Sequence, residues 1–323
     1  MLTLQHPPTL NPEKSNQQKP VTQNIALNLT PEVIERAKLG VSYARNPNTS
    51  AMIEKVLSDA EEVAEGGRKD KTNGRLQRIM LQTVIRTLFK VKVEFPERLP
   101  TTPSLVVGNH LNHIDPFILL SQLPADTFYN VLGDARSLYS SWWKRQIMSF
   151  VKGVIPLERI WKEEVAILEA AKAGREDLAD LAAEIQEYVP KGNSIEAMRR
   201  LDRIVQSTFN RNEGIMLFPE GKLGSVEGKL LPLKRGVAIY ALRSGMPIVP
   251  IAIVGTKDLY FGKEITLRVG EPITVKQSKR PKSEEIQAVL DELQTAMVDL
   301  LPKNYTEPKA PKFLRNFLNN LLV

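Results

Sequence analysis

The chain has 323 residues, of which 44 are Lys or Arg and 37 are Asp or Glu, so its formal net charge is +7. It contains no cysteine, which excludes disulfides, thiolate-bound metals and cysteine nucleophiles and favours a reducing compartment. The excess of positive charge suits an anionic partner such as a phosphorylated substrate, an anionic lipid or nucleic acid, without choosing among them.

The first 74 residues are expected to form a tail followed by helices. Residues 1–28 are rich in Pro, Gln, Asn and Thr, a composition typical of disordered chain. Residues 29–74 form a predicted helical segment. One helix begins after Thr30, with Pro31 at its first position, and another spans residues 49–64.

The next predicted helix carries one apolar stripe and a basic remainder. The stripe recurs at helical spacing and consists of Leu76, Ile79, Met80, Val84, Ile85, Leu88 and Phe89. One interpretation is a core helix with a solvated basic face. The other is a helix that lies on an anionic membrane surface.

Residues 75–302 are predicted to form the main domain. Short apolar segments alternate there with helical patterns, which is typical of an α/β fold with a mostly parallel central sheet flanked by helices. Residues from about 161 to 192 are charged and strongly helical, so we expect an inserted helical arm there. The expected strands are residues 104–107, 127–132, 154–157, 214–218, 248–254 and 265–269.

Residues 303–323 form a predicted amphipathic C-terminal tail, which either docks as a closing helix or lies on a membrane surface. The most apolar stretch, residues 236–255, is interrupted by Arg243 and two prolines, so it does not meet the length of about 20 apolar residues that a bilayer crossing needs. No signal pattern opens the chain. We therefore expect a cytoplasmic protein that is peripheral on the inner face of a membrane.

The segment VVGNHLNHIDPF, residues 106–117, holds two of the three histidines of the chain. A strand that ends near Asn109 delivers His110 to the carboxyl edge of the sheet, where α/β proteins bind ligands. Asp115 followed by proline is typical of a helix N-cap, which is a purely structural interpretation. That interpretation leaves both histidines unexplained.

Two functional interpretations remain for this segment. His110, His113 and Asp115 have donor atoms suited to a metal, but the only other histidine is His6 in the tail, so we predict no metal site. Alternatively, His110 takes a proton from a hydroxyl while Asp115 orients its ring and stabilises the imidazolium. A strand–loop–helix layout lets the two side chains meet.

Four motifs in order resemble those of the glycerolipid acyltransferases, a family that includes lysophosphatidic-acid acyltransferases. The resemblance covers residues from about 75 to 275. The motifs are NHLNHID (residues 109–115), GVIPLER (153–159), LFPEGKLG (217–224) and VPIAIVG (249–255), and KLLPLKRG (229–236) adds a further similar stretch.

The resemblance implies transfer of a fatty acyl group from acyl-CoA or acyl-carrier protein to the hydroxyl of a lysophosphatidic-acid-type acceptor. It implies that His110 is the base and that Asp115 orients it. It implies neither a metal nor another cofactor, because the thioester is already activated, and no nucleic-acid partner. The residues implied to bind the acceptor phosphate or shape the loop around it are Arg159, Glu220, Gly221, Lys222, Lys234 and Arg235.

Two positions depart from the family pattern. Asn112 replaces a serine in the first motif, and Leu223 replaces an arginine that follows Phe-Pro-Glu-Gly. Lys222 is adjacent, but lysine lacks the bidentate fork of arginine. The acceptor could therefore be glycerol-3-phosphate or another lysolipid. A non-catalytic protein that binds anionic lipid and a metal-dependent hydrolase are the alternatives outside this class.

Overall fold

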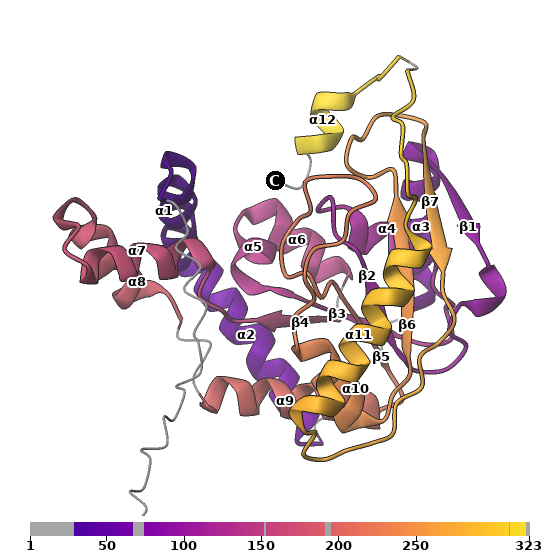
Figure 1. The fold of residues 1–323 in the computed structure, drawn as a ribbon, viewed down its shortest axis with the longest axis horizontal. Helices are drawn as coiled ribbons and strands as arrows, with labels where there is room; N and C mark the ends of the chain where they lie inside the picture. The colour runs from indigo at the N-terminus through magenta and orange to yellow at the C-terminus, as the bar shows by residue number, and fades with distance from the viewer. Residues whose placement is uncertain (1–28, 67–73, 152, 191–194, 310, 321–323) are drawn as a thin grey trace, which may run out of the picture.

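Strands from both halves of the chain form one sheet in the order β1-β7-β6-β2-β5-β3-β4 (Figure 1). The computed structural model describes residues 29–66, 74–151, 153–190, 195–309 and 311–320; the predicted tail of residues 1–28 lies outside them. The strands are β1 (Phe89–Glu94), β2 (Leu105–Gly108), β3 (Tyr129–Asp134), β4 (Val154–Leu157), β5 (Gly214–Leu217), β6 (Ile248–Val254) and β7 (Lys263–Val269).

Helices cover both faces of this sheet and extend beyond it. The helices before β5 are α1 (Pro31–Arg45), α2 (Pro47–Ala64), α3 (Gly74–Leu88), α4 (Asp115–Gln122), α5 (Ala135–Tyr139), α6 (Trp142–Val151), α7 (Lys162–Lys172), α8 (Ala179–Tyr188) and α9 (Ile195–Asn210). The later ones are α10 (Gly236–Ser244), α11 (Ser283–Leu300) and α12 (Arg315–Asn320), and two short 3-10 turns are η1 (Pro96–Arg98) and η2 (Glu176–Leu178).

The predicted α/β fold with a mostly parallel sheet is confirmed. Every neighbouring pair of strands in this sheet is parallel except β6 and β7, which are antiparallel. Strand β1 was not predicted, because Phe89 continues the apolar stripe of the preceding helix. The helix instead ends at Leu88, and the alternation of lysine with Val91 and Val93 forms the edge strand.

Alternate residues of the central strands face two separate cores. Leu105 and Val107 of β2 pack in the core covered by α2, α9, α10 and α11, whereas Val106 packs with α3 and α4 on the opposite face. All three side chains are fully buried. Burial on both faces explains why the strands next to the site are continuous apolar segments.

The apolar stripe of α3 divides between the core and the surface. Ile85 and Phe89 are each only 2% exposed, while the side chains nearer the N-terminus of the helix are about half exposed. Those exposed residues are Leu76, Ile79, Met80 and Val84, here named the α3 face. Neither of the two interpretations of the stripe therefore describes the whole helix.

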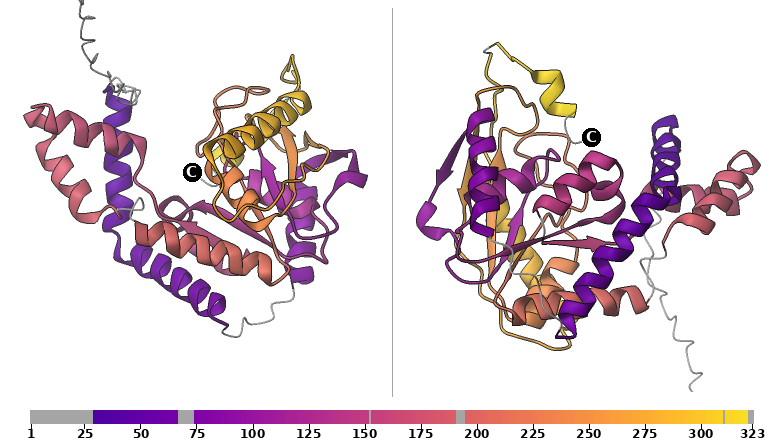
Figure 2. Two further views of the ribbon diagram at one scale, coloured as in Figure 1. Left: turned by 60° about the horizontal axis from the view of Figure 1, so that its bottom comes forward. Right: turned by 180° about the vertical axis from the view of Figure 1, so that it is seen from behind.

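Helices α1, α7 and α8 form an arm that projects from one side of the sheet (Figures 1 and 2). The arm has its own small core, to which α1 contributes Ala37 and Val41, and α7 contributes Ile167. The two helices of the predicted insertion are separated near Gly174, which has a φ of +96°. Among the described residues, no helix is long and apolar enough to span a bilayer.

Candidate active site

The loop between β2 and α4 is attached to the sheet at Asn109. The Asn109 side chain donates to the backbone oxygen of Ile253 at 2.9 Å and accepts from the nitrogen of Ile253 at 2.7 Å, so it extends the pairing of β2 with β6. Gly108 precedes it, and a Cβ there would lie 2.9 Å from the ring of Phe218. A glycine at position 108 therefore lets the Phe218 ring lie against the loop.

His110 and Asp115 meet as the catalytic-pair interpretation requires. Nδ1 of His110 lies 3.0 Å from Oδ2 of Asp115, and this oxygen also accepts the backbone N–H groups of Leu111 at 2.7 Å and Asn112 at 2.8 Å. The Asp115 side chain is fully buried, while that of His110 is 17% exposed. With Nδ1 directed at the carboxylate, Nε2 is the nitrogen left to exchange protons with a substrate.

The purely structural interpretation of Asp115 as a helix cap is wrong. Asp115 is the first residue of α4, with Ile114 before it in the cap position, and its side chain points back to the loop rather than to the amides of the helix. A capping side chain accepts from the second or third residue of its own helix. The carboxylate instead holds the loop that carries His110.

The motif around Phe218 supports His110 from the other side. The ring of Phe218 stacks on the His110 ring with centroids 4.4 Å apart. Glu220 is 3% exposed and accepts the backbone N–H of His110 at 2.8 Å and that of Leu231 at 2.7 Å. Burial raises the pKa of Glu220, and these hydrogen bonds oppose the rise. Glu220 therefore joins the histidine loop to the segment that carries Lys234.

Gly221 brings two predicted phosphate-binding residues together. Its φ is +66°, and its carbonyl accepts Nη1 of Arg159 at 2.8 Å. A Cβ on Gly221 would lie 3.5 Å from that same nitrogen and 3.6 Å from Cγ of Lys234. The left-handed backbone favours glycine at this position, while the two distances show that Arg159 and Lys234 both lie in van der Waals range of it.

Cationic side chains gather around Gly221. Partial loss of hydration lowers the pKa of Lys234, and the charges of Lys162, Arg159 and Lys222 lower it further. Lys162 was not predicted from the sequence, because it belongs to the arm and only the fold brings it near Lys234. A cluster of like charges is relieved when an anion binds between them.

Two other residues of the motifs, Arg235 and Leu223, have different surroundings. The guanidinium of Arg235 donates to the hydroxyl of Ser283 in α11 at 3.1 Å. The side chain of Leu223, where the family pattern has arginine, is 36% exposed. The Arg235 guanidinium thus binds α11 rather than the cluster around Gly221, and Leu223 carries no charge.

His113 differs from His110 in its surroundings. Burial, followed by the neighbouring charge of His110, lowers the pKa of His113 to about 4. The two imidazole rings have centroids 6.3 Å apart. No group of three or more His, Asp or Glu side chains with metal-binding geometry occurs in the described part of the chain.

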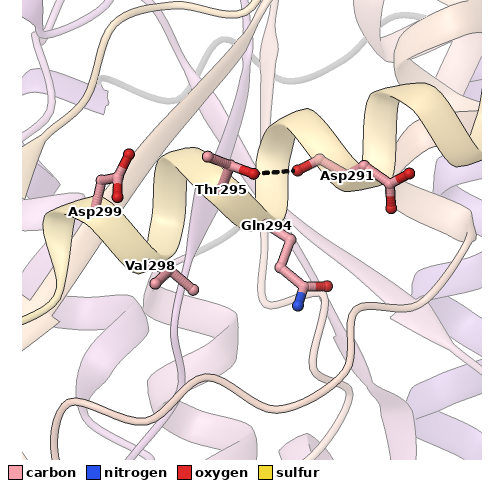
Figure 3. Close-up of a pocket in the computed structure, with 5 residues that line it drawn as sticks. All are labelled: Asp291, Gln294, Thr295, Val298 and Asp299. Atoms are coloured by element: carbon pink, nitrogen blue, oxygen red, sulfur yellow. Dashed lines mark hydrogen bonds between the residues drawn. The ribbon is translucent and has the colours of Figure 1, made fainter.

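A pocket elsewhere on the surface does not belong to this site. It lies along α11, and the hydroxyl of Thr295 donates within that helix to the carbonyl of Asp291 at 2.9 Å (Figure 3). None of its lining residues occurs in the four motifs. They are Asp291, Gln294, Thr295, Val298 and Asp299.

The candidate site lies within a region of the chain that matches a known protein family. The family model described as Acyltransferase matches residues 90–254, which is more than half of the chain and includes all four motifs up to Val254. A solved 1-acyl-sn-glycerophosphate (LPA) acyltransferase from Thermotoga maritima is 16% identical with a TM-score of 0.43, covering 84% of this chain and 99% of that one.

Named relatives are similar over parts of their length. A 1-acyl-sn-glycerol-3-phosphate acyltransferase from Cocos nucifera is 29% identical over 36% of this chain and 39% of its own, and the chloroplastic one from Brassica napus is 28% identical over 58% and 44%. The alpha enzyme of Homo sapiens is 24% identical over 62% and 58%. The chain thus spans less than half the length of the first two relatives. From the match to the family model, the chain belongs to the acyltransferase family.

Proposed function

We propose that this protein transfers a fatty acyl group from an acyl thioester to the hydroxyl of a lysophosphatidic-acid-type acceptor in glycerolipid synthesis. The observation that carries the proposal is the His110–Asp115 pair, in which a buried carboxylate with two backbone hydrogen bonds holds Nδ1 of a partly exposed imidazole. The names of the similar proteins from Cocos nucifera and Homo sapiens point to the same reaction.

In the proposed reaction His110 acts as general base. Nε2 takes the proton of the acceptor hydroxyl as its oxygen attacks the thioester carbonyl carbon, and the new C–O bond forms. The tetrahedral intermediate then expels the thiolate, the C–S bond breaks, and the imidazolium returns the proton to sulfur. Asp115 stabilises the imidazolium between these steps. The activated thioester makes a metal or other cofactor unnecessary, and its source is CoA or acyl-carrier protein.

The acceptor phosphate is proposed to bind at the cluster around Gly221. Arg159, Lys222 and Lys234 supply positive charge there, and Lys162 of the arm adds a fourth cation. Charge-assisted hydrogen bonds to phosphate are roughly twice as strong as neutral ones. Arg159 is the member with a planar fork, so it supplies the directional contact.

A membrane surface is the proposed source of the acceptor. Four exposed large apolar side chains are here named the Phe313 patch: Phe261, which lies just before β7, and Phe313, Leu314 and Phe317, which lie at or next to α12. The N–H of Phe261 donates to the carbonyl of Phe313 at 2.9 Å, and that of Gly262 donates to Leu88 at the end of α3 at 2.8 Å. These bonds join the Phe313 patch to the helix that carries the α3 face. Exposed apolar groups of this size favour insertion into a lipid interface.

The other candidate acceptor is glycerol-3-phosphate or another lysolipid. Leu223 favours a lysolipid without a phosphate monoester, because a leucine next to Lys222 in the sequence replaces the guanidinium of the family pattern. A lysolipid whose headgroup carries less negative charge than a phosphate monoester would suit such a site.

Thiol release from acyl-CoA tests the proposal and separates the alternatives. Purified protein is assayed with 1-acyl-glycerol-3-phosphate, glycerol-3-phosphate and lysophosphatidylcholine, each with and without a chelator. The proposal predicts fastest release with 1-acyl-glycerol-3-phosphate, unaffected by chelator. Release with glycerol-3-phosphate or lysophosphatidylcholine, but not with 1-acyl-glycerol-3-phosphate, would show that the proposed acceptor is wrong. No release above the blank with any acceptor would favour a lipid-binding protein without catalysis.

A further inference from the structure

Asp134, at the carboxyl end of β3, connects Arg159 to the arm. Its Oδ2 accepts Nε of Arg159 at 2.7 Å and the indole N–H of Trp161 at 2.9 Å. Its Oδ1 accepts the backbone N–H of Ser137 at 3.0 Å and so caps α5. The Asp134 side chain is 12% exposed, so these three donors fix a largely buried carboxylate.

The charge state of Asp134 supports this arrangement. Burial alone would raise its pKa, but the positive charge of Arg159 and the hydrogen bonds outweigh burial and hold the pKa of Asp134 below its usual value. The carboxylate is therefore ionised at neutral pH. An ionised acceptor at Nε directs the rest of the guanidinium toward the carbonyl of Gly221, where Nη1 donates at 2.8 Å.

A buried ion pair fixes the backbone of Arg159 from the other side. Arg136 is 3% exposed and makes two hydrogen bonds to the carboxylate of Glu164 in α7, at 2.5 and 2.9 Å. Nη2 of Arg136 also donates to the carbonyl of Arg159 at 2.8 Å, and Nη1 donates to the carbonyl of Gly40 in α1 at 3.1 Å. Arg159 therefore lies where two helices of the arm meet α5.

We propose that Asp134 is a positioning residue that aims the guanidinium of Arg159 at the phosphate of the acceptor, and that the arm sets acceptor affinity through it. This proposal rests on the proposed function of the Gly221 cluster. A free arginine side chain has several rotatable bonds, and a phosphate that binds it must order them. Pre-ordering by Asp134 removes that cost, so its effect falls on acceptor binding and not on bond formation.

The test replaces Asp134 with asparagine, which also caps helices and so preserves α5. The asparagine amide has a single oxygen acceptor, whereas the carboxylate has two oxygens that accept from Ser137, Arg159 and Trp161. The amide also carries no charge. Asp134→Asn should raise KM for 1-acyl-glycerol-3-phosphate by about threefold to tenfold, because the phosphate must then order the released side chain of Arg159. Both kcat and KM for acyl-CoA should stay within about twofold. Equal KM values in variant and wild type would overturn the proposal.

The arm offers a matched control. Asp177 also pairs with an arginine, accepting Nε of Arg175 at 2.8 Å, but both side chains are at least half exposed. Asp177→Asn should leave every kinetic constant unchanged, since exposed pairs contribute little. In an Arg159→Gln background, Asp134→Asn should add less than about twofold to KM. A full, independent effect there would show that Asp134 does not act through Arg159.

A second readout does not depend on turnover. The side-chain Nε–H of Arg159, assigned by ¹⁵N NMR through its loss in Arg159→Gln, should exchange slowly with solvent in the wild type and rapidly in Asp134→Asn. Unchanged exchange contradicts the positioning role. Wild-type protein that does not acylate 1-acyl-glycerol-3-phosphate contradicts the proposed function instead. If Asp134→Asn fails to fold, Asp134→Ser takes its place, because serine keeps an oxygen that caps α5 but its side chain is too short to reach Arg159. The same two measurements then apply.

Discussion

Oδ2 of Asp115 lies 3.0 Å from Nδ1 of His110 and accepts two backbone amides of the intervening loop as well. One buried oxygen thus sets both the shape of the loop and the direction of the imidazole ring. This arrangement fits the proposed orienting role of Asp115 and not a helix cap, because a capping side chain would direct its oxygen into the helix.

Asparagine at position 115 should inactivate the enzyme without unfolding it. The asparagine oxygen can accept the two loop amides, but the tautomer of His110 with its proton on Nδ1 loses the anion that stabilises it. We expect kcat to fall by about 10²–10⁴-fold. Melting temperature, followed by circular dichroism, should change by only a few degrees. Wild-type turnover in Asp115→Asn would contradict the catalytic pair.

His113 should make the protein less stable in mild acid. Its pKa is about 4 in the folded state against an ordinary value of 6.5, so between these pH values the unfolded chain binds more protons than the folded one. Stability is then lost as pH falls from about 6.5 to 4, by up to roughly 3 kcal/mol. Urea unfolding at pH 7 and pH 4.5 measures the loss.

The matched variant for this effect is His113→Asn, which has no titrating ring. It should lose less stability than the wild type between the same two pH values. An identical loss in both proteins would mean that the carboxylates, and not His113, cause the acid sensitivity.

Lys222 and Leu223 should control the acceptor. Lys222→Ala is expected to raise KM for 1-acyl-glycerol-3-phosphate several-fold and to leave KM for acyl-CoA unchanged, because an exposed cation contributes modestly to phosphate binding. Leu223→Arg should lower the same KM by restoring a guanidinium. Lys229→Ala, which removes an exposed lysine of the neighbouring segment, is the control. No effect of either substitution at 222 or 223 would indicate an uncharged acceptor.

Vesicle flotation should reveal the role of the Phe313 patch. Removal of residues 309–323 would be a poor test, because Leu318 is 2% exposed and Arg315 pairs with Asp258, so the truncation also disrupts packing. The double substitution Phe313→Ser and Phe317→Ser changes only exposed side chains. It should weaken binding to vesicles that contain anionic lipid at both low and high salt.

The control for flotation uses exposed apolar residues of α9, a helix at the opposite end of the molecule from α12 (Figure 1). Ile195 and Met198 of α9 are 66% and 57% exposed, and serine at both positions should leave binding unchanged. Equal flotation of the Phe313–Phe317 variant and the wild type would assign the membrane contact to other residues, with the α3 face next to be tested.

Contacts between residues close together in the chain, and strands that are fully buried, could be predicted from the sequence. His110 and Asp115 are five residues apart, so a strand–loop–helix pattern was enough to bring them together, and β2, β5 and β6 stood out as short apolar segments. The partners of Arg159 could not be predicted. Asp134 lies 25 residues away, and it meets Arg159 because β3 pairs with β4 in parallel register. Lys162 likewise reaches the site only through the packing of the arm.

Product formation by the wild type and two histidine variants tests the proposed role of His110 most directly. Each protein is incubated with acyl-CoA and 1-acyl-glycerol-3-phosphate, and the diacyl product and free thiol are quantified by mass spectrometry. If His110 is the general base, the wild type forms equal amounts of both products, His110→Ala loses about 10²–10⁴-fold, and His113→Ala loses much less. His110→Ala with activity similar to the wild type, or a His113→Ala variant equally impaired, would contradict that role.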